Sequence, residues 1–125
     1  MNNKNIFYYY KANGGQASSL NFGIQKTRGE FICFLDGDAV HTSHFFGKRI
    51  EEVIDTNPGY SLFTCVTNRV NCTYQIAPGV DVKTNDQEYH RNFGDRIWET
   101  YGNQVMDVTN NMELSGVLIV IKKSV

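Results

Sequence analysis

The feature that most constrains the fold is an unbroken apolar run that ends at two carboxylates. The run is Phe31–Leu35, and Asp36, Gly37 and Asp38 follow it directly. An apolar run this short, bounded by turn residues, predicts a strand that is buried on both faces of a parallel sheet. Ligands of such sheets bind outside the carboxyl ends of the strands. Asp36 and Asp38 are therefore expected at a ligand-binding edge.

The two aspartates are candidate ligands of a metal ion. Carboxylates on either side of a glycine are hard oxygen donors that can converge on Mg²⁺ or Mn²⁺, and Gly37 lets the backbone leave the strand between them. Asp and Gly are also common in turns that bind nothing. The triplet alone therefore leaves open both a metal site and an ordinary turn.

The segment before the apolar run predicts a helix start that faces a phosphate. Gly14 and Gly15 precede an expected helix over residues 16–26. A helix N-terminus after flexible glycines offers free N–H groups and a positive dipole end to an anion. Asn21, about a turn further on, is a polar donor and acceptor on a different face than the buried stripe. That stripe is expected to consist of Ala17, Leu20 and Ile24.

Strand-like and helix-like patterns alternate along the chain, which favours an α/β fold with a doubly wound, largely parallel sheet. Further strands are expected at 6–10, 60–67 and 114–121, and further helices at 43–54 and 86–101. The stretch 68–85 predicts a long loop, and loops of that length are usually functional or mobile. The positions expected to face inward are Phe46, Ile50, Val53, Leu62, Cys65, Val66, Tyr89, Phe93 and Ile97.

Composition excludes several classes of protein. The chain is 41% hydrophobic and 20% charged, and its net charge of −1 predicts no special attraction to nucleic acid or to an anionic membrane. The apolar runs are too short to span a bilayer, and the polar residues 1–5 do not lead into a signal-peptide segment. Cys33, Cys65 and Cys72 lack metal-ligand spacing and fit the reduced cysteines of a cytoplasmic protein.

The histidines have a functional and a structural interpretation. His41 and His44 follow the aspartates closely, and together these four residues could form a mixed nitrogen and oxygen site for zinc or iron. Capping of the next helix, or exposure to solvent, is the more common role for His44. His90 is expected to be structural or exposed rather than a general base.

Three later segments carry weaker signals. Asn68 and Arg69 follow a strand and could reach a phosphate, but Arg69 could equally be an ordinary surface residue. Trp98 and Tyr101 could stack on a sugar ring, although aromatic residues at helical spacing usually belong to the core. Ser115 and Gly116 open the last expected strand, and a glycine in a strand can mark a bulge.

Residues 13–38 resemble the middle of the nucleotide-sugar-binding half of family 2 glycosyltransferases with the GT-A fold. The matching pattern is Asn-Gly-Gly, then Asn-x-Gly-Ile, then Arg-Gly-Glu-Phe-Ile-x-Phe-Leu-Asp-x-Asp. The resemblance implies that Asp36 and Asp38, the DxD motif, hold Mn²⁺ or Mg²⁺, and that Gly14, Gly15, Asn21 and Asp36 bind the nucleotide. Softer similarities follow at 67–69, 89–90, 98–101 and 115–124.

By this resemblance residues 1–125 form a partial, Rossmann-like GT-A domain. It would bind a nucleotide-diphosphate sugar donor and transfer the sugar to an unknown glycan, lipid or protein acceptor. A complete domain is considerably larger, so the first strand-helix unit and the part that brings the catalytic carboxylate are expected to be missing. Strand edges exposed in this way would favour self-association.

Two other hypotheses remain open at this point. The chain could be a non-catalytic nucleotide-binding or interaction module derived from the same fold. It could also be a different Mg²⁺-dependent enzyme that acts on phosphates. The catalytic base is not predicted from the sequence.

Overall fold

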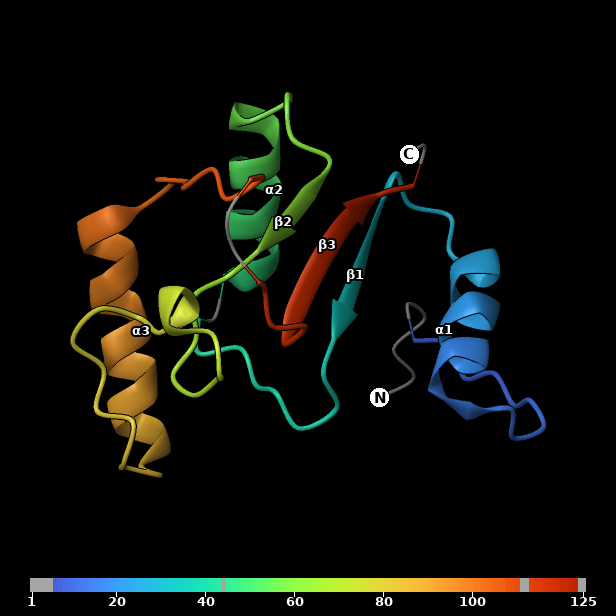
Figure 1. Cartoon of the computed structure of the whole chain (residues 1–125), viewed down its shortest axis with the longest axis horizontal. Helices are drawn as coiled ribbons and strands as arrows, with labels where there is room; N and C mark the ends of the chain where they lie inside the picture. The colour runs from blue at the N-terminus through green and yellow to red at the C-terminus, as the bar shows by residue number, and fades with distance from the viewer. Residues whose placement is uncertain (1–5, 44, 111–112, 124–125) are drawn as a thin grey trace.

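The computed structural model describes residues 6–43, 45–110 and 113–123. In these residues three α-helices and one short 3₁₀-helix surround a three-stranded sheet (Figure 1). The helices are α1 (Gly15–Lys26), α2 (Phe46–Thr56), η1 (Thr73–Gln75) and α3 (Gln87–Tyr101), and the strands are β1 (Phe31–Leu35), β2 (Leu62–Thr64) and β3 (Leu118–Lys122).

The sheet is antiparallel between neighbouring strands. β3 lies between β1 and β2 and pairs with both in antiparallel register, with Val120 opposite Cys33 on one side and Phe63 on the other. The predicted doubly wound parallel sheet is therefore not confirmed, and the one parallel pairing within the described residues is an isolated bridge between Thr67 and Ile76. Because β1 and β2 both oppose β3, they still run in the same direction and end at the same edge.

β1 has the predicted bounds but not the predicted burial on both faces. Ile32 is buried, whereas Cys33 and Leu35 are exposed. The reason is that β1 is an outer strand of the described sheet. Side chains from α2 and α3 line a cavity over β2 and β3, and they leave the Cys33 face of β1 open to solvent.

α1 forms as predicted, but its buried stripe is largely wrong. Ala17 and Leu20 are exposed, and only Ile24 of the three predicted residues is half-buried. Phe22 is half-buried instead and packs edge-on against Tyr9, with 6.2 Å between ring centroids. The apolar face of α1 is therefore rotated away from the position that spacing alone suggested.

The segment 6–10, predicted as a strand, has no regular secondary structure. Its aromatic side chains are exposed, and Tyr8 and Tyr10 are more than nine-tenths accessible. No backbone hydrogen bond found between described residues involves this segment. Residues with high β-propensity form a strand only where a neighbouring strand provides backbone hydrogen bonds.

α2 begins three residues later than expected and ends two residues later. Asn57 caps its C-terminus, and the Asn57 Nδ2 group donates to the Val53 carbonyl over 2.8 Å. Phe46, expected inside, is exposed, while Ile50 and Val53 are half-buried. Proline at 58 then prevents the helix from continuing.

α3 matches its prediction closely. Asp86 is its N-cap and accepts a hydrogen bond from the Glu88 N–H over 2.9 Å, which is the usual role of an Asp at that position. Tyr89 and Phe93 stack on one face with 5.8 Å between ring centroids. The helix lies across a gap from the sheet in Figure 1, and the stretch 68–85 runs between them.

The other two strands are shorter than expected. β2 keeps only Leu62–Thr64, and Leu62 and Val66 are exposed rather than inward-facing. β3 starts at Leu118, because residues 116–117 form a turn. The buried apolar residues of the described chain are Ile32, Ala77, Leu118 and Val120. Of these residues, Leu118 and Val120 also line a cavity of about 160 Å³ between α2, the sheet and Trp98.

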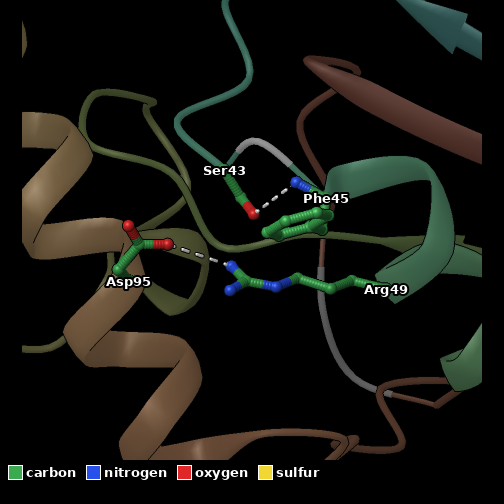
Figure 2. Close-up of polar contacts among 4 residues, drawn as sticks. All are labelled: Ser43, Phe45, Arg49 and Asp95. Carbon is green, nitrogen blue, oxygen red and sulfur yellow. Dashed lines mark hydrogen bonds and ion pairs between the residues drawn. The ribbon is translucent and has the colours of Figure 1, made fainter.

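An ion pair joins α2 to α3 beside that cavity. Arg49 Nη1 lies 3.3 Å from Asp95 Oδ1, and the Arg49 guanidinium lies 4.6 Å from the centre of the Trp98 ring. Figure 2 shows Arg49 reaching from α2 to α3 below the ring of Phe45, whose N–H donates to Ser43 Oγ over 3.3 Å. The contacts of Arg49 therefore hold α2 beside α3.

Candidate functional site

Three chain segments meet at the sheet edge where β1 and β2 end. The Asp36 N–H donates to the Val117 carbonyl over 3.0 Å, which joins the end of β1 to the turn before β3. Gln75 Nε2 donates to the carbonyls of Cys65 and Ser115, each over 3.3 Å, which joins the end of β2 to the same turn. The edge is therefore a connected structure rather than three separate loops.

Asp36 and Asp38 lie in a tight turn directly after β1. The Ala39 N–H donates to the Asp36 carbonyl over 3.0 Å and closes the turn, and the Gly37 N–H donates to Asp36 Oδ1 over 3.0 Å. Both aspartates are exposed. Their carboxylates are thus open to solvent at a point whose backbone is anchored to β3.

The donor set at this turn fits one kind of metal and not another. Within the described ranges, no three His, Cys, Asp or Glu side chains group closely enough to hold a metal ion. A zinc site takes three or four such ligands, so the mixed site with His41 lacks support here, and His44 lies outside the described residues. Mg²⁺ is commonly held by one or two carboxylates together with substrate phosphates, and two exposed aspartates match that requirement.

His41 is held by an aromatic neighbour. Its ring stacks on Phe46 with 3.8 Å between centroids and 4° between planes. Partial burial lowers the pKa of His41 and favours the neutral ring. His41 therefore supports the start of α2 rather than adding positive charge beside the aspartates.

The glycine pair forms the start of α1. Gly14 is the N-cap, and Gly15 has φ of +82°, a conformation that side chains rarely adopt. Asn13 Oδ1 accepts a hydrogen bond from the Gly15 N–H over 3.1 Å. Asn21 is exposed six residues after Gly15, nearly two turns further along α1. In Figure 1 the N-terminal end of α1 lies at the same end of the molecule as the arrowhead of β1.

Arg69 has a structural role in this structure. Its guanidinium donates to the carbonyl oxygens of Val82 and Thr84 and to Asn85 Oδ1, and it holds the end of the long loop in place. His90 Nε2 lies 3.0 Å from the same Thr84 carbonyl. Of the two interpretations of Arg69, the geometry favours the structural one.

Trp98 and Ser115 also contact other residues of the chain. Trp98 is half-buried against Arg49 and the cavity, whereas Tyr101 is exposed on the last turn of α3. The Ser115 N–H donates to Gln75 Oε1. The turn before β3 is therefore fixed by protein contacts on the side that faces β2.

Sequence reasoning missed Gln75. It is the buried polar residue of the described chain, 4% exposed, and it lies in the stretch predicted as a loop. A glutamine among other polar loop residues has no periodic signal. The contacts of Gln75 become visible only in the structure, where it lies between the end of β2 and the turn before β3.

A comparison with protein families matches most of the chain to one family. The family model described as glycosyl transferase family 2 matches residues 2–112. An acidic turn at the end of a strand and a glycine-led helix start lie within that match. The chain belongs to glycosyl transferase family 2, and the α/β fold of that family is the GT-A fold.

Proteins named as glycosyltransferases are similar to parts of the chain. An uncharacterized glycosyltransferase of Rickettsia typhi is 26% identical over 107 residues, which is 83% of this chain and 28% of the relative. One from Rickettsia bellii is 44% identical over 48 residues, 38% of this chain and 6% of the relative. The uncharacterized glycosyltransferase EpsJ of Bacillus subtilis is 44% identical over 43 residues, 34% of this chain and 12% of the relative.

The chain thus spans less than a third of the length of these relatives. No solved structure is significantly similar to it. Among the residues that the structure describes, none of the helices is long and apolar enough to cross a membrane.

Proposed function

We propose that this chain carries the donor-binding part of a glycosyltransferase, which transfers a sugar from a nucleotide-diphosphate sugar to an acceptor. The observation that carries the proposal is the meeting of three segments at one sheet edge beside two exposed carboxylates, Asp36 and Asp38. Membership of glycosyl transferase family 2 supports the same reaction class.

In this proposal Asp36 and Asp38 bind Mg²⁺ or Mn²⁺ together with the diphosphate of the donor. A bound divalent cation neutralises negative charge on a departing diphosphate. Asp36 has a fixed backbone, because its N–H and its carbonyl are both hydrogen-bonded. A fixed backbone limits the positions that the carboxylate can take and favours productive geometry. Asp38, for which no backbone hydrogen bond is found among the described residues, would adjust to the ligand.

The start of α1 would contact the nucleotide. Gly14 and Gly15 lie at the positive end of the helix dipole, and neither carries a side chain that would keep a phosphate away. A phosphate that bound the Gly15 N–H would replace Asn13 Oδ1, which accepts from it in this structure. Asn21 can donate and accept hydrogen bonds from its exposed position. These three residues and Asp36 form the proposed nucleotide contacts.

The acceptor and the catalytic base are left unassigned in this proposal. The acceptor would be a glycan, a lipid or a protein. A cytoplasmic location is part of the proposal, and the free thiols of Cys33, Cys65 and Cys72 support it, because disulfides are rare in that compartment.

Calorimetry with UDP and GDP tests the proposal. We expect binding with Mn²⁺ or Mg²⁺ present and at least about tenfold weaker binding with a chelator, a difference of about 1.4 kcal/mol. Asp38→Asn should remove most of the metal dependence. Asp55→Asn, an exposed carboxylate on α2, is the matched control and should change nothing.

The outcomes separate the alternatives. Equal affinity with and without chelator would remove the metal from the hypothesis. The absence of any nucleotide binding would favour the non-catalytic interaction module. Binding of inorganic pyrophosphate with metal, but of neither nucleotide, would favour a different phosphate-handling enzyme.

A further inference from the structure

The buried side chain of Gln75 connects two of the three segments at the proposed donor edge. The two N–H groups of its Nε2 are shared among three acceptors, Thr64 Oγ1 at 3.0 Å and the carbonyls of Cys65 and Ser115 at 3.3 Å, and its Oε1 atom accepts from the Ser115 N–H. The Gln75 side chain therefore binds both the backbone N–H and the backbone carbonyl of Ser115, in the turn before β3.

These hydrogen bonds hold the Gln75 side chain in one position. Burying an amide is unfavourable unless it is hydrogen-bonded, and loss of a partner leaves buried groups unsatisfied. Thr64 Oγ1 in turn donates to the Leu118 carbonyl over 2.8 Å. The backbone of Gln75 is also fixed, because its carbonyl accepts from the Thr67 N–H over 2.7 Å. The side chain thus projects from a fixed backbone into a satisfied network.

The hydrogen bonds of Gln75 are linked to Asp36 through the turn before β3. Gln75 holds Ser115 at one end of the short stretch 115–117, and Val117 accepts from the Asp36 N–H at the other end. We propose that Gln75 is a positioning residue, which sets the backbone position of Asp36 by holding this stretch. The proposal deepens the proposed function and rests on it for its effect on the ligand.

Amide hydrogen exchange tests the positioning without any ligand. Gln75→Met keeps the volume of the side chain and removes its hydrogen bonds. We expect the Asp36 amide to exchange at least about tenfold faster than in the unchanged chain, as for loss of one hydrogen bond. Asn57→Ala is the matched control, since it removes a side-chain amide bond before β2, at the opposite end of that strand, and should leave the Asp36 amide unaffected.

A milder variant covers the case in which Gln75→Met fails to fold. Thr64→Val keeps the shape of Thr64 and removes the hydroxyl between Gln75 and Leu118. It should accelerate exchange at Asp36 in the same direction by about threefold, as for a partial loss of one such hydrogen bond. Unchanged protection of Asp36 in the folded variants would overturn the proposal, even if Ser115 exchanged faster.

Nucleotide binding provides the second readout. In Gln75→Met we expect the metal-dependent part of UDP or GDP affinity to fall at least about fivefold, while Asn57→Ala retains it. If the unchanged chain binds no nucleotide with metal, the proposed function fails, yet hydrogen exchange at Asp36 still decides the positioning. If exchange accelerates but metal-dependent affinity stays the same, Gln75 does not act on the site, and the inference is wrong.

Discussion

Gly94 offers the sharpest test of how the segment after Asp38 packs. A Cβ atom at this position would overlap Thr42 Oγ1 and lie 3.1 Å from Thr42 Cβ. Replacing a glycine inside a helix by alanine stabilises by about 0.5–1 kcal/mol, while forcing an atom into a packed contact costs about 1–3 kcal/mol. The difference between the two is a net loss of up to about 2.5 kcal/mol, so Gly94→Ala should lower the free energy of unfolding.

Urea unfolding followed by Trp98 fluorescence measures this change, since Trp98 is the single tryptophan and lies one turn further along α3. Gly23→Ala is the matched control, because it makes the same substitution inside α1 where a Cβ meets no atom within 4 Å. It should stabilise the chain by about 0.5–1 kcal/mol.

Thr42→Ala supplies the refuting experiment. In that background the overlapping hydroxyl is gone, so Gly94→Ala should lose most of its steric cost and approach the stabilising effect of Gly23→Ala. The two changes should therefore couple by about 1–3 kcal/mol, the size of that steric cost. Residues without shared contacts add within about 0.3–0.5 kcal/mol. Additive behaviour would show that Thr42 does not pack on Gly94, and that the segment after Asp38 is not docked on α3 in this way.

Three further outcomes are expected. Burial raises the pKa of the Cys65 thiol, so iodoacetamide should label Cys65 more slowly than Cys72 at pH 8. The labelling rate of Cys65 should continue to rise above pH 9. Equal labelling rates for the two thiols would contradict this burial. The exposed side chains of β1 should promote self-association, and Leu35→Lys should shift light scattering toward the monomer, whereas an unchanged distribution would exclude β1 as the contact. The chain alone should transfer sugar at background rate, because the metal, the acceptor and its activating group stabilise a transition state only together. Turnover at a normal enzymatic rate would make His90 and Glu99 candidates for the catalytic base.

Local signals in the sequence predicted local structure well. The Asp86 cap and the apolar spacing after it were sufficient for α3, and the short apolar run gave the bounds of β1. The glycine pair correctly marked the start of α1. In each case the residues that decide the structure lie within a few positions of one another.

Burial and strand pairing depended on contacts that the sequence does not contain. Alternation of strands and helices predicted parallel neighbours, but it could not show that β3 enters between β1 and β2 in the opposite direction. The aromatic run 6–10 has the composition of a strand, yet no strand of the described chain pairs with it. Leu20 and Phe46 have helical spacing, and both remain exposed because no described element covers them.

The antiparallel insertion of β3 explains why the candidate site could be predicted only in part. A strand that runs against its two neighbours places its amino end beside their carboxyl ends. The turn before β3 must therefore lie between the end of β1 and the end of β2, and residues 115–117 become central to the edge. A parallel arrangement would have placed this turn at the opposite edge, so the sequence prediction had no reason to connect Gln75 with Asp36. The acidic turn was identifiable from its own residues, whereas the side chain that supports it became identifiable only with the direction of β3.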